Sequence, residues 1–202
     1  MTLDRPGSTL PAVRYGAIAR FADERGSFRE LWRDAETRSI DPADAGAGPR
    51  VRPRFVQANL SSSAPGVLRG LHLHRHQLDR WLVTSGRAFV ALVDVRPMLA
   101  GGPRPEVETR ELGEDDWVEI PVGVAHGFLA LEPLDLVYLV TTAYDGSDEY
   151  GFAWDDPAAG VRWPDPSATA GAAGPDDGPI LSERDRTNPS LDELVARLRA
   201  PG

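Results

Sequence analysis

The middle of the chain is a series of short apolar runs separated by turn signals, and this pattern constrains the fold more than any other feature. Clusters of Gly, Pro, Asp and Ser separate the runs, as at 97–105 and 112–116. Many short strands with regular turn punctuation are typical of an antiparallel sandwich or barrel. The sequence therefore predicts an all-β fold. The expected strands are 55–60, 81–83, 88–95, 107–112, 117–120, 127–131 and 136–141.

The C-terminal end of the chain carries different signals. Residues 165–179 are poor in bulky apolar side chains and rich in Pro, Gly and Ala, which predicts a mobile loop. Farther on, Ser190 and Glu193 form a capping-box pattern, which predicts a short helix over 190–199. Its apolar residues recur at helical spacing and would pack on the rest of the fold. They are Leu191, Leu194, Val195 and Leu198.

Composition limits the domain count and the class of partner. A chain of 202 residues, 41% of them hydrophobic, can bury one core, so we expect a single domain over 1–202. The formal net charge of −9 argues against nucleic acid and membranes as partners, although a few convergent arginines can still bind an anionic small molecule. The sequence has no signal-peptide pattern, and no apolar run approaches the roughly 18 residues of a membrane span. We therefore expect a soluble, cytoplasmic protein.

Two residue types are missing from the chain, and their absence limits its chemistry. Without cysteine there are no disulfides, thiolate metal sites or cysteine nucleophiles, which fits the cytoplasm. All 22 basic residues are arginine, so lysine is missing as well. No reaction step here can use a lysine ammonium group or a lysine Schiff base.

Three of the four histidines, His72, His74 and His76, alternate along the chain. On a regular strand this spacing puts all three on one face, and with His126 it would gather every imidazole in one region. A lone histidine is more often structural than functional, but three that alternate on one expected strand favour a function. We expect the working pocket to form around His72.

The spacing around these histidines resembles the two cupin motifs. Residues 72–86 follow the pattern His-x-His-x4-Asp-x6-Gly, and residues 121–126 follow Pro-x-Gly-x-x-His. The resemblance implies a cupin jelly-roll β-barrel and allows a site of three histidines and one carboxylate, ligands that suit Zn, Fe, Mn or Ni. Many cupins keep the barrel without an ion, so a divalent metal stays an alternative. Its ligands would be His72, His74, Asp79 and His126.

Longer segments are similar to the dTDP-4-dehydrorhamnose 3,5-epimerase family, in the family's order from about residue 20 to residue 189. One of them is Gly-Val-Leu-Arg-Gly-Leu-His at 66–72. The resemblance implies a cupin-type fold and an isomerase in deoxysugar biosynthesis, acting on a dTDP-linked 4-keto-6-deoxyhexose without a cofactor. The other matching segments are 24–30, 55–63, 93–96, 120–129, 136–138, 154–164 and 181–185.

The family's reaction explains the residues that would carry it. The C4 ketone acidifies the protons on C3 and C5, so a base removes one, an enolate forms, and a proton returns from the opposite face. The resemblance assigns the base to His72, the carboxylate that orients this imidazole to Asp185, and the acid to Tyr138. A phenol with an ordinary pKa of about 10 suits the reprotonation of an enolate.

The resemblance also assigns the contacts to the substrate. Arginine suits the diphosphate because its planar fork can bond two oxygens at once. In the family, the early Arg-Gly-x-Phe-x-Glu strand crosses into the partner subunit's site, which implies a homodimer. The matching positions are Arg25, Phe28, Glu30, Gln57, Asn59, Arg69, His126, Glu149 and Arg184.

One departure from the family keeps three interpretations open. The family has a lysine shortly after its histidine, and here Asp79 takes that position, with Arg80 next to it. In the first interpretation, the chain is an epimerase of altered specificity in which His126 or Arg80 holds the enolate oxygen. Alternatively it is a metal-binding cupin enzyme, or a non-catalytic binder of sugar nucleotides. The sequence names neither the carbon that is inverted nor the sugar.

Overall fold

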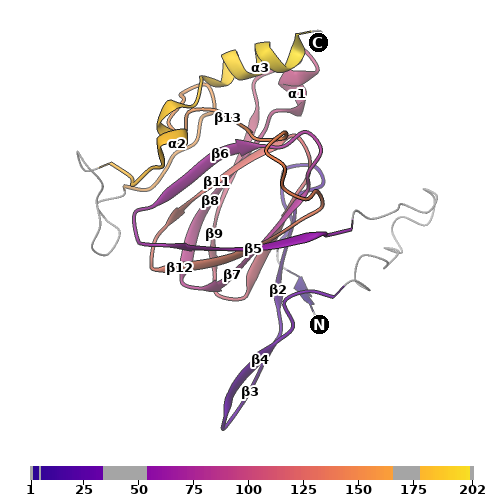
Figure 1. The fold of residues 1–202 in the computed structure, drawn as a ribbon, viewed down its shortest axis with the longest axis vertical. Coiled ribbons are helices and arrows are strands. Elements are labelled where there is room, and N and C mark those ends of the chain that lie inside the picture. The colour runs from indigo at the N-terminus through magenta and orange to yellow at the C-terminus, as the bar shows by residue number, and fades with distance from the viewer. Residues whose placement is uncertain (1, 5, 34–53, 166–177, 201–202) are drawn as a thin grey trace, which may run out of the picture.

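The computed structural model describes residues 2–4, 6–33, 54–165 and 178–200, and two antiparallel sheets form most of this part. Figure 1 shows the strands of the two sheets facing each other. The six-stranded sheet consists, in spatial order, of β1 (Thr2–Asp4), β2 (Arg14–Ile18), β10 (Asp116–Ile120), β7 (Asp79–Ser85), β12 (Leu134–Val140) and β5 (Gln57–Ser63). The five-stranded sheet consists of β13 (Tyr150–Gly151), β6 (Leu68–Leu73), β11 (Val124–Ala130), β8 (Arg87–Asp94) and β9 (Glu106–Gly113). The all-β prediction is confirmed.

Strands that follow one another in the sequence mostly lie in opposite sheets. From β5 to β8 the chain crosses between the sheets at every step, as in a jelly roll. The main core lies between the sheets and includes Trp81 and Val83 from β7, Val90 and Leu92 from β8, and Phe128 from β11. The chain order therefore places side chains from distant segments face to face inside the sandwich.

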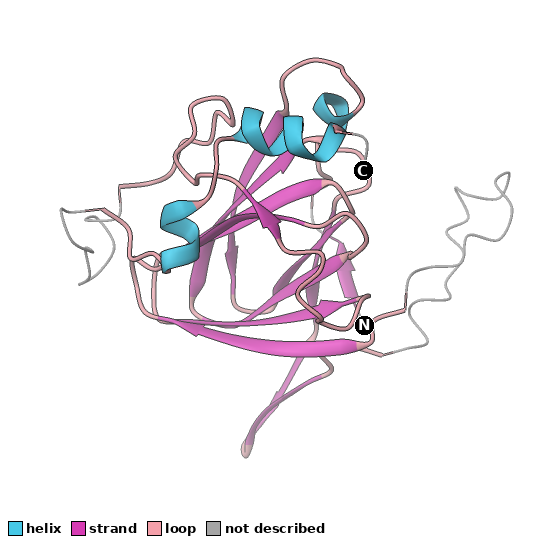
Figure 2. Ribbon diagram, turned by 45° about the horizontal axis from the view of Figure 1, so that its top comes forward, coloured by secondary structure: helices cyan, strands magenta, loops and turns pink. Residues whose placement is uncertain are grey.

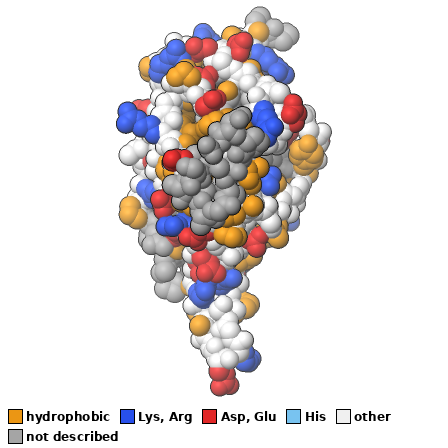
Figure 3. Space-filling view, turned by 90° about the vertical axis from the view of Figure 1, so that its left-hand side faces the viewer, with side chains coloured by type: hydrophobic (Ala, Val, Ile, Leu, Met, Phe, Trp, Pro, Cys, Tyr) orange, Lys and Arg blue, Asp and Glu red, His pale blue; other side chains and the backbone are white. Residues whose placement is uncertain are grey.

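The hairpin of β3 (Arg20–Asp23) and β4 (Gly26–Arg29) forms a separate two-stranded sheet. It projects from the body of the molecule, as Figures 1 and 3 show. Its side chains pack little, and Phe21 and Phe28 are 58% and 69% exposed. A projecting hairpin with exposed aromatic rings is a surface of the kind that binds another protein surface.

A second core covers the outer face of the five-stranded sheet. Helix α3 (Leu191–Arg199) and Phe152 pack there, and Figure 2 shows the helices on this side of the molecule. Every residue of β11 is buried because the strand has one face toward each core. Two shorter helices, α1 (Arg96–Leu99) and α2 (Glu183–Thr187), complete the fold.

The helix expected over 190–199 is confirmed. The Ser190 side chain accepts a hydrogen bond from the Glu193 backbone N–H, and the Glu193 carboxylate accepts one from the Ser190 backbone N–H at 2.8 Å. This capping box satisfies two N–H groups that the first turn leaves unpaired. Leu191, Leu194 and Val195 are its buried residues. None of the described helices is long and apolar enough to cross a membrane.

Each of the seven expected strands overlaps a strand of the structure, but other elements had no clear sequence signal. β6 was expected to run through the alternating histidines, yet it ends at Leu73. His74 and His76 therefore lie in the turn that follows, and the expectation of one shared face is wrong for His76, which is exposed. Most of the loop predicted at 165–179 lies outside the described residues.

Candidate active site

A cavity of about 450 Å³ lies between the two sheets, within the range typical of small-molecule sites. Both sheets line it. The lining residues of the six-stranded sheet are Gln57, Asn59, Ser61, Asp79, Trp81, Leu136, Tyr138 and Val140. Those of the five-stranded sheet are Arg69, His72, His126 and Phe128. The loops add His74, Gln77, Tyr144 and Glu149, and helix α2 adds Arg184.

Strands β6 and β11 pair closely along one wall of the cavity. His72 and His126 are direct cross-strand partners, and the register shifts between His126 and Phe128. Gly70 has a φ of +131°, and a Cβ there would lie 2.5 Å from the Cα of Gly127. Two facing glycines therefore let the strands approach, and this approach brings the two imidazoles into the same cavity.

His72 forms a dyad with Asp185. Its Nε2 lies 2.7 Å from Asp185 Oδ1, and the other carboxylate oxygen accepts a hydrogen bond from Ser182 Oγ at 2.8 Å. Ser182 is the N-cap of α2, so the cap of a short helix positions the carboxylate. Burial by itself raises the pKa of Asp185, but the hydrogen bonds from His72 and Ser182 outweigh it and hold this pKa below its ordinary value.

Tyr138 lies on β12, in the sheet opposite β6, and lines the same cavity as His72. Burial is the main cause that raises its pKa, and the nearby Asp79 raises it further. The phenol therefore keeps its proton at neutral pH. The predicted base and the predicted acid lie on opposite walls of one cavity.

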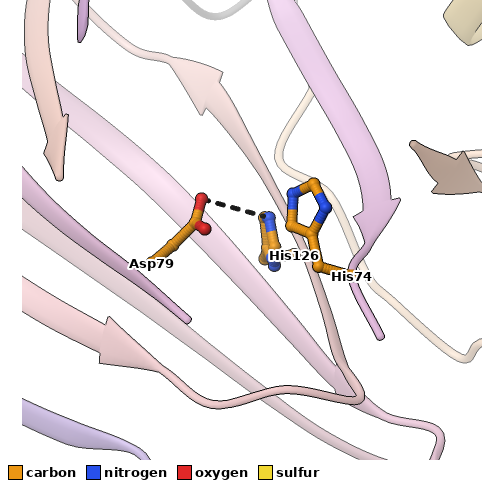
Figure 4. A group of neighbouring side chains, drawn as sticks. All are labelled: His74, Asp79 and His126. Carbon is orange, nitrogen blue, oxygen red and sulfur yellow. Dashed lines mark ion pairs between the residues drawn. The ribbon is translucent and has the colours of Figure 1, made fainter. Parts of the chain in front are cut away.

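A second group of titratable side chains, His74, Asp79 and His126, lies buried in the same cavity (Figure 4). His126 Nε2 is 3.8 Å from Asp79 Oδ2. Burial raises the pKa of Asp79, whereas burial and the neighbouring His74 lower the pKa of His126 well below its ordinary value. Of the four metal ligands suggested by the cupin spacing, these three have ligand atoms within 4.8 Å of one another among the described residues, and His72 lies outside the group.

Strand alternation on β7 decides between Asp79 and Arg80 at the position of the family's lysine. Asp79 and Trp81 face the cavity, and Arg80 faces the other side of the sheet. There the Arg80 guanidinium donates to Glu119 at 2.7 Å and lies 4.7 Å from the ring of Trp117. The suggestion that Arg80 holds the enolate oxygen is therefore wrong.

Most of the predicted substrate contacts meet at the cavity, and three do not. Those that line it are Gln57, Asn59, Arg69, His126, Glu149 and Arg184. Arg25, Phe28 and Glu30 are absent from the described lining and belong to the β3–β4 hairpin and its continuation. Arg25 pairs with Asp23, and Glu30 pairs with Arg33.

Several lining residues were missed at the sequence level, although alternation could have found some of them. On β12 the inward position of Tyr138 is shared by Leu136 and Val140, two residues away on either side. On β5 the same rule adds Ser61 to the predicted Gln57 and Asn59. The rule also adds Trp81, two residues from Asp79 on β7, and Phe128, two residues from His126 on β11, whereas the loop residues Gln77 and Tyr144 carried no such signal.

Comparison with known proteins relates the chain to one family. The model of the dTDP-4-dehydrorhamnose 3,5-epimerase family matches residues 8–193. The spore coat polysaccharide biosynthesis protein SpsL of Bacillus subtilis is 34% identical over 160 residues, which are 76% of this chain and 96% of that protein. The dTDP-4-dehydrorhamnose 3,5-epimerase of Sinorhizobium fredii is 35% identical over 183 residues, 87% of this chain and 83% of that protein.

A solved structure extends the similarity to three dimensions. The dTDP-6-deoxy-D-glucose-3,5-epimerase of Legionella pneumophila, in complex with dTDP-4-keto-L-rhamnose, superposes with a TM-score of 0.75 at 27% identity. The match covers 100% of this chain and 99% of that one. The chain is therefore a member of the dTDP-4-dehydrorhamnose 3,5-epimerase family, an isomerase of the epimerase class.

Proposed function

We propose that the chain inverts one or both of the carbons next to the C4 ketone of a dTDP-linked 4-keto-6-deoxyhexose, in deoxysugar biosynthesis. The observation that carries the proposal is the 2.7 Å hydrogen bond between His72 and Asp185, in a cavity whose opposite wall carries Tyr138. Inversion needs a base on one face of the sugar and an acid on the other. The dTDP-sugar bound to the Legionella relative supports the substrate class.

His72 is the proposed base. Its Nε2–H is donated to Asp185, so in the neutral ring Nδ1 carries the lone pair that takes a proton from C3 or C5. The C–H bond breaks, its electron pair forms the enolate, and negative charge gathers on the C4 oxygen. Asp185, whose pKa is lowered, stays ionised and stabilises the imidazolium that results.

Tyr138 is the proposed acid. Because its pKa is raised, the phenol is protonated at neutral pH and can give its proton to the opposite face of the enolate carbon. A new C–H bond forms as the phenol O–H bond breaks, and the carbon is inverted. His72 and Tyr138 then return to their starting protonation states through solvent, so the reaction consumes no other reagent.

The enolate oxygen also needs a positively charged or hydrogen-bonding partner. His126 was suggested for this role. However, its ring donates Nδ1–H to the Val124 carbonyl at 3.1 Å, and the lowered pKa of His126 keeps the ring neutral at physiological pH. A neutral imidazole has one N–H, so Nε2 has no proton to donate. Since Arg80 faces away as well, the partner must come from elsewhere in the cavity.

In this proposal, four of the predicted contacts bind the diphosphate, the sugar or the base of the substrate. Arg69 and Arg184 line the cavity and suit the diphosphate, while Gln57 and Asn59 offer side-chain amides to the sugar or the base. We also propose a homodimer in which the β3–β4 hairpin inserts into the partner's cavity. The supporting observations are its projection from the body and the exposure of Phe28.

Solvent exchange tests the proposal directly. The chain is incubated in D₂O with dTDP-4-keto-6-deoxyglucose, and the C3 and C5 positions are followed by proton NMR. We expect deuterium at C3, at C5 or at both, and the pattern identifies the inverted carbon. No exchange at either carbon overturns the epimerase proposal, and dTDP binding without exchange supports a non-catalytic binder instead.

A further inference from the structure

The side-chain amide of Gln77 has no role in the proton transfers described above, although it lines the cavity that His72 and Tyr138 share. It belongs to the turn between β6 and β7. Gln77 Nε2 donates a hydrogen bond to Asp79 Oδ1 at 2.8 Å, which uses one of its two N–H groups. No other hydrogen bond of this nitrogen is seen among the described residues. The second N–H is therefore left for a ligand.

Several contacts hold this amide in one place. The backbone on both sides is anchored, because the Asp148 carboxylate accepts the N–H of Gln77 at 3.2 Å and Thr141 Oγ1 accepts the next N–H at 2.9 Å. The acceptor of the side chain is held as well, since Trp81 Nε1 donates to Asp79 Oδ2 at 3.3 Å. A donor that is fixed before the substrate arrives needs no reorganisation during the reaction.

The strand register places this donor where the wall of the proposed base meets the wall of the proposed acid. Tyr138 is the cross-strand partner of Trp81, and Asp79 lies two residues from Trp81 on the same inward face of β7. Across the cavity, Asp79 Oδ2 is 3.8 Å from His126 Nε2 (Figure 4), and His126 is the cross-strand partner of His72. The amide that is bound to Asp79 therefore lies beside the junction of the two walls.

We propose that Gln77 holds the enolate oxygen by donating its second amide N–H to the C4 oxygen of the substrate, and that Asp79 is a positioning residue that orients the amide. This role rests on the proposed epimerase reaction. Negative charge gathers on the C4 oxygen as the C–H bond breaks, so the hydrogen bond is stronger in the transition state than in the ground state. Side-chain amides are among the groups that stabilise such oxyanions in enzymes.

The other donors of the described lining have other partners or lie elsewhere. Arg69 and Arg184 are proposed to bind the diphosphate, and Arg184 already pairs with Glu149. Gln57 and Asn59 lie on β5, the strand on the far side of β12 from β7. These positions leave the amide of the turn as the donor beside the junction of the two walls.

Deuterium exchange by Gln77→Met tests the donor, because methionine keeps the length of the side chain and removes both N–H groups. Exchange at C3 and C5 of dTDP-4-keto-6-deoxyglucose is followed in D₂O, and dTDP binding is measured by calorimetry. We expect exchange to fall about 10²–10³-fold, by the same factor at each carbon that exchanges, because both enolates place their charge on the same oxygen. The affinity for dTDP should change no more than about twofold, since dTDP lacks the sugar.

His76→Met is the matched control, because it makes the same replacement at the exposed neighbouring residue of the turn. It should exchange at the unmodified rate. Circular dichroism verifies that each variant is folded, and if Gln77→Met is not, Gln77→Ala decides. Exchange by the folded Gln77 variant within about threefold of the unmodified rate overturns the proposal.

Infrared spectroscopy of the bound ketone reports the hydrogen bond itself. A hydrogen bond to a carbonyl oxygen lowers its stretching frequency, so the substrate is bound to His72→Asn, which does not turn it over. Adding Gln77→Met should move the C4 carbonyl band to higher frequency. Adding Asp79→Ala should move it in the same direction, because the amide is no longer oriented. A band that stays in place overturns the role of the residue that was replaced.

The outcomes separate the role of Gln77 from the proposed reaction. An unmodified chain that exchanges neither carbon overturns the epimerase proposal. Normal exchange by both the unmodified chain and Gln77→Met overturns the role of Gln77 and leaves the epimerase proposal standing.

Discussion

At the scale of single residues, the chemistry of His72 is set by the side chain behind it. Asp185 is 4% exposed, and its carboxylate bonds both the His72 ring and the Ser182 hydroxyl. The lone pair at Nδ1 therefore follows from the hydrogen bond at Nε2. A base of this design depends on the charge of its partner as much as on the imidazole.

Asp185→Asn tests the charge of this partner through stability. Because the folded state lowers the pKa of Asp185, the ionised group adds stability above its unfolded pKa of about 3.9, and this contribution is lost as the pH falls through the lower folded value. We expect Asp185→Asn to lower the free energy of unfolding at pH 7 by about 1.5–3 kcal/mol. Urea unfolding between pH 7 and pH 2 should show the difference shrinking below pH 4.

Asp192→Asn is the control for this titration. Asp192 is an exposed residue of α3 that pairs with Arg104 at the surface, so we expect a loss of about 0–1 kcal/mol. A difference for Asp185→Asn that stays constant from pH 7 to pH 2 contradicts the account of its lowered pKa.

Tyr138→Phe tests the acid by removing one hydroxyl and keeping the ring. We expect net epimerisation to fall about 10²–10⁴-fold. Deuterium should still enter the substrate, because His72 can remove a proton and return a deuteron on the same face. Tyr144→Phe, at the exposed rim of the cavity, should stay near the unmodified rate. Full epimerase activity in Tyr138→Phe rules this tyrosine out as the acid.

At the scale of elements, sequence patterns predicted the strands and the helix that depend on neighbouring residues. The apolar runs predicted β7 to β12, and the capping box predicted α3, because burial and capping act on neighbouring residues. The end of β6 at Leu73 was not predictable in this way. Asp148 fixes the following turn from a distant segment, so the histidine alternation does not continue as a strand.

The N-cap of α3 gives a prediction at this scale. Ser190→Ala removes the hydroxyl that accepts the Glu193 N–H, and we expect a loss of about 1 kcal/mol in the free energy of unfolding. Ser190→Asp keeps an acceptor at the N-cap and should retain most of the stability. Thermal unfolding followed by circular dichroism measures both variants. Equal destabilisation by Ala and Asp contradicts the capping role.

The β3–β4 hairpin gives the second prediction at this scale. In the proposed dimer Phe28 is buried in the partner, so Phe28→Asp should shift the chain from dimer to monomer in sedimentation velocity. It should also weaken dTDP binding at least tenfold. Ser27→Asp places the same charge on the opposite face of β4 and is the control. A monomeric, fully active unmodified chain contradicts the exchange of hairpins.

At the scale of the whole molecule, the site exists because the two sheets and helix α2 meet. His72 and Asp185 are 113 residues apart in the sequence, and Tyr138 reaches the cavity from the opposite sheet. Neither spacing nor periodicity can predict contacts of that length. Family resemblance suggested which residues belong together. The structure then showed that Arg80 lies outside the cavity and that His74 and Asp79 line it.

The central claim is that His72 removes the substrate proton, and His72→Asn tests it most directly. Its deuterium exchange into dTDP-4-keto-6-deoxyglucose is compared with that of the unmodified chain and of His76→Asn, a control at the exposed histidine of the next turn. We predict that His72→Asn abolishes exchange at every position while dTDP binding changes no more than a few-fold, and that His76→Asn exchanges normally. Exchange by His72→Asn at the unmodified rate contradicts the account.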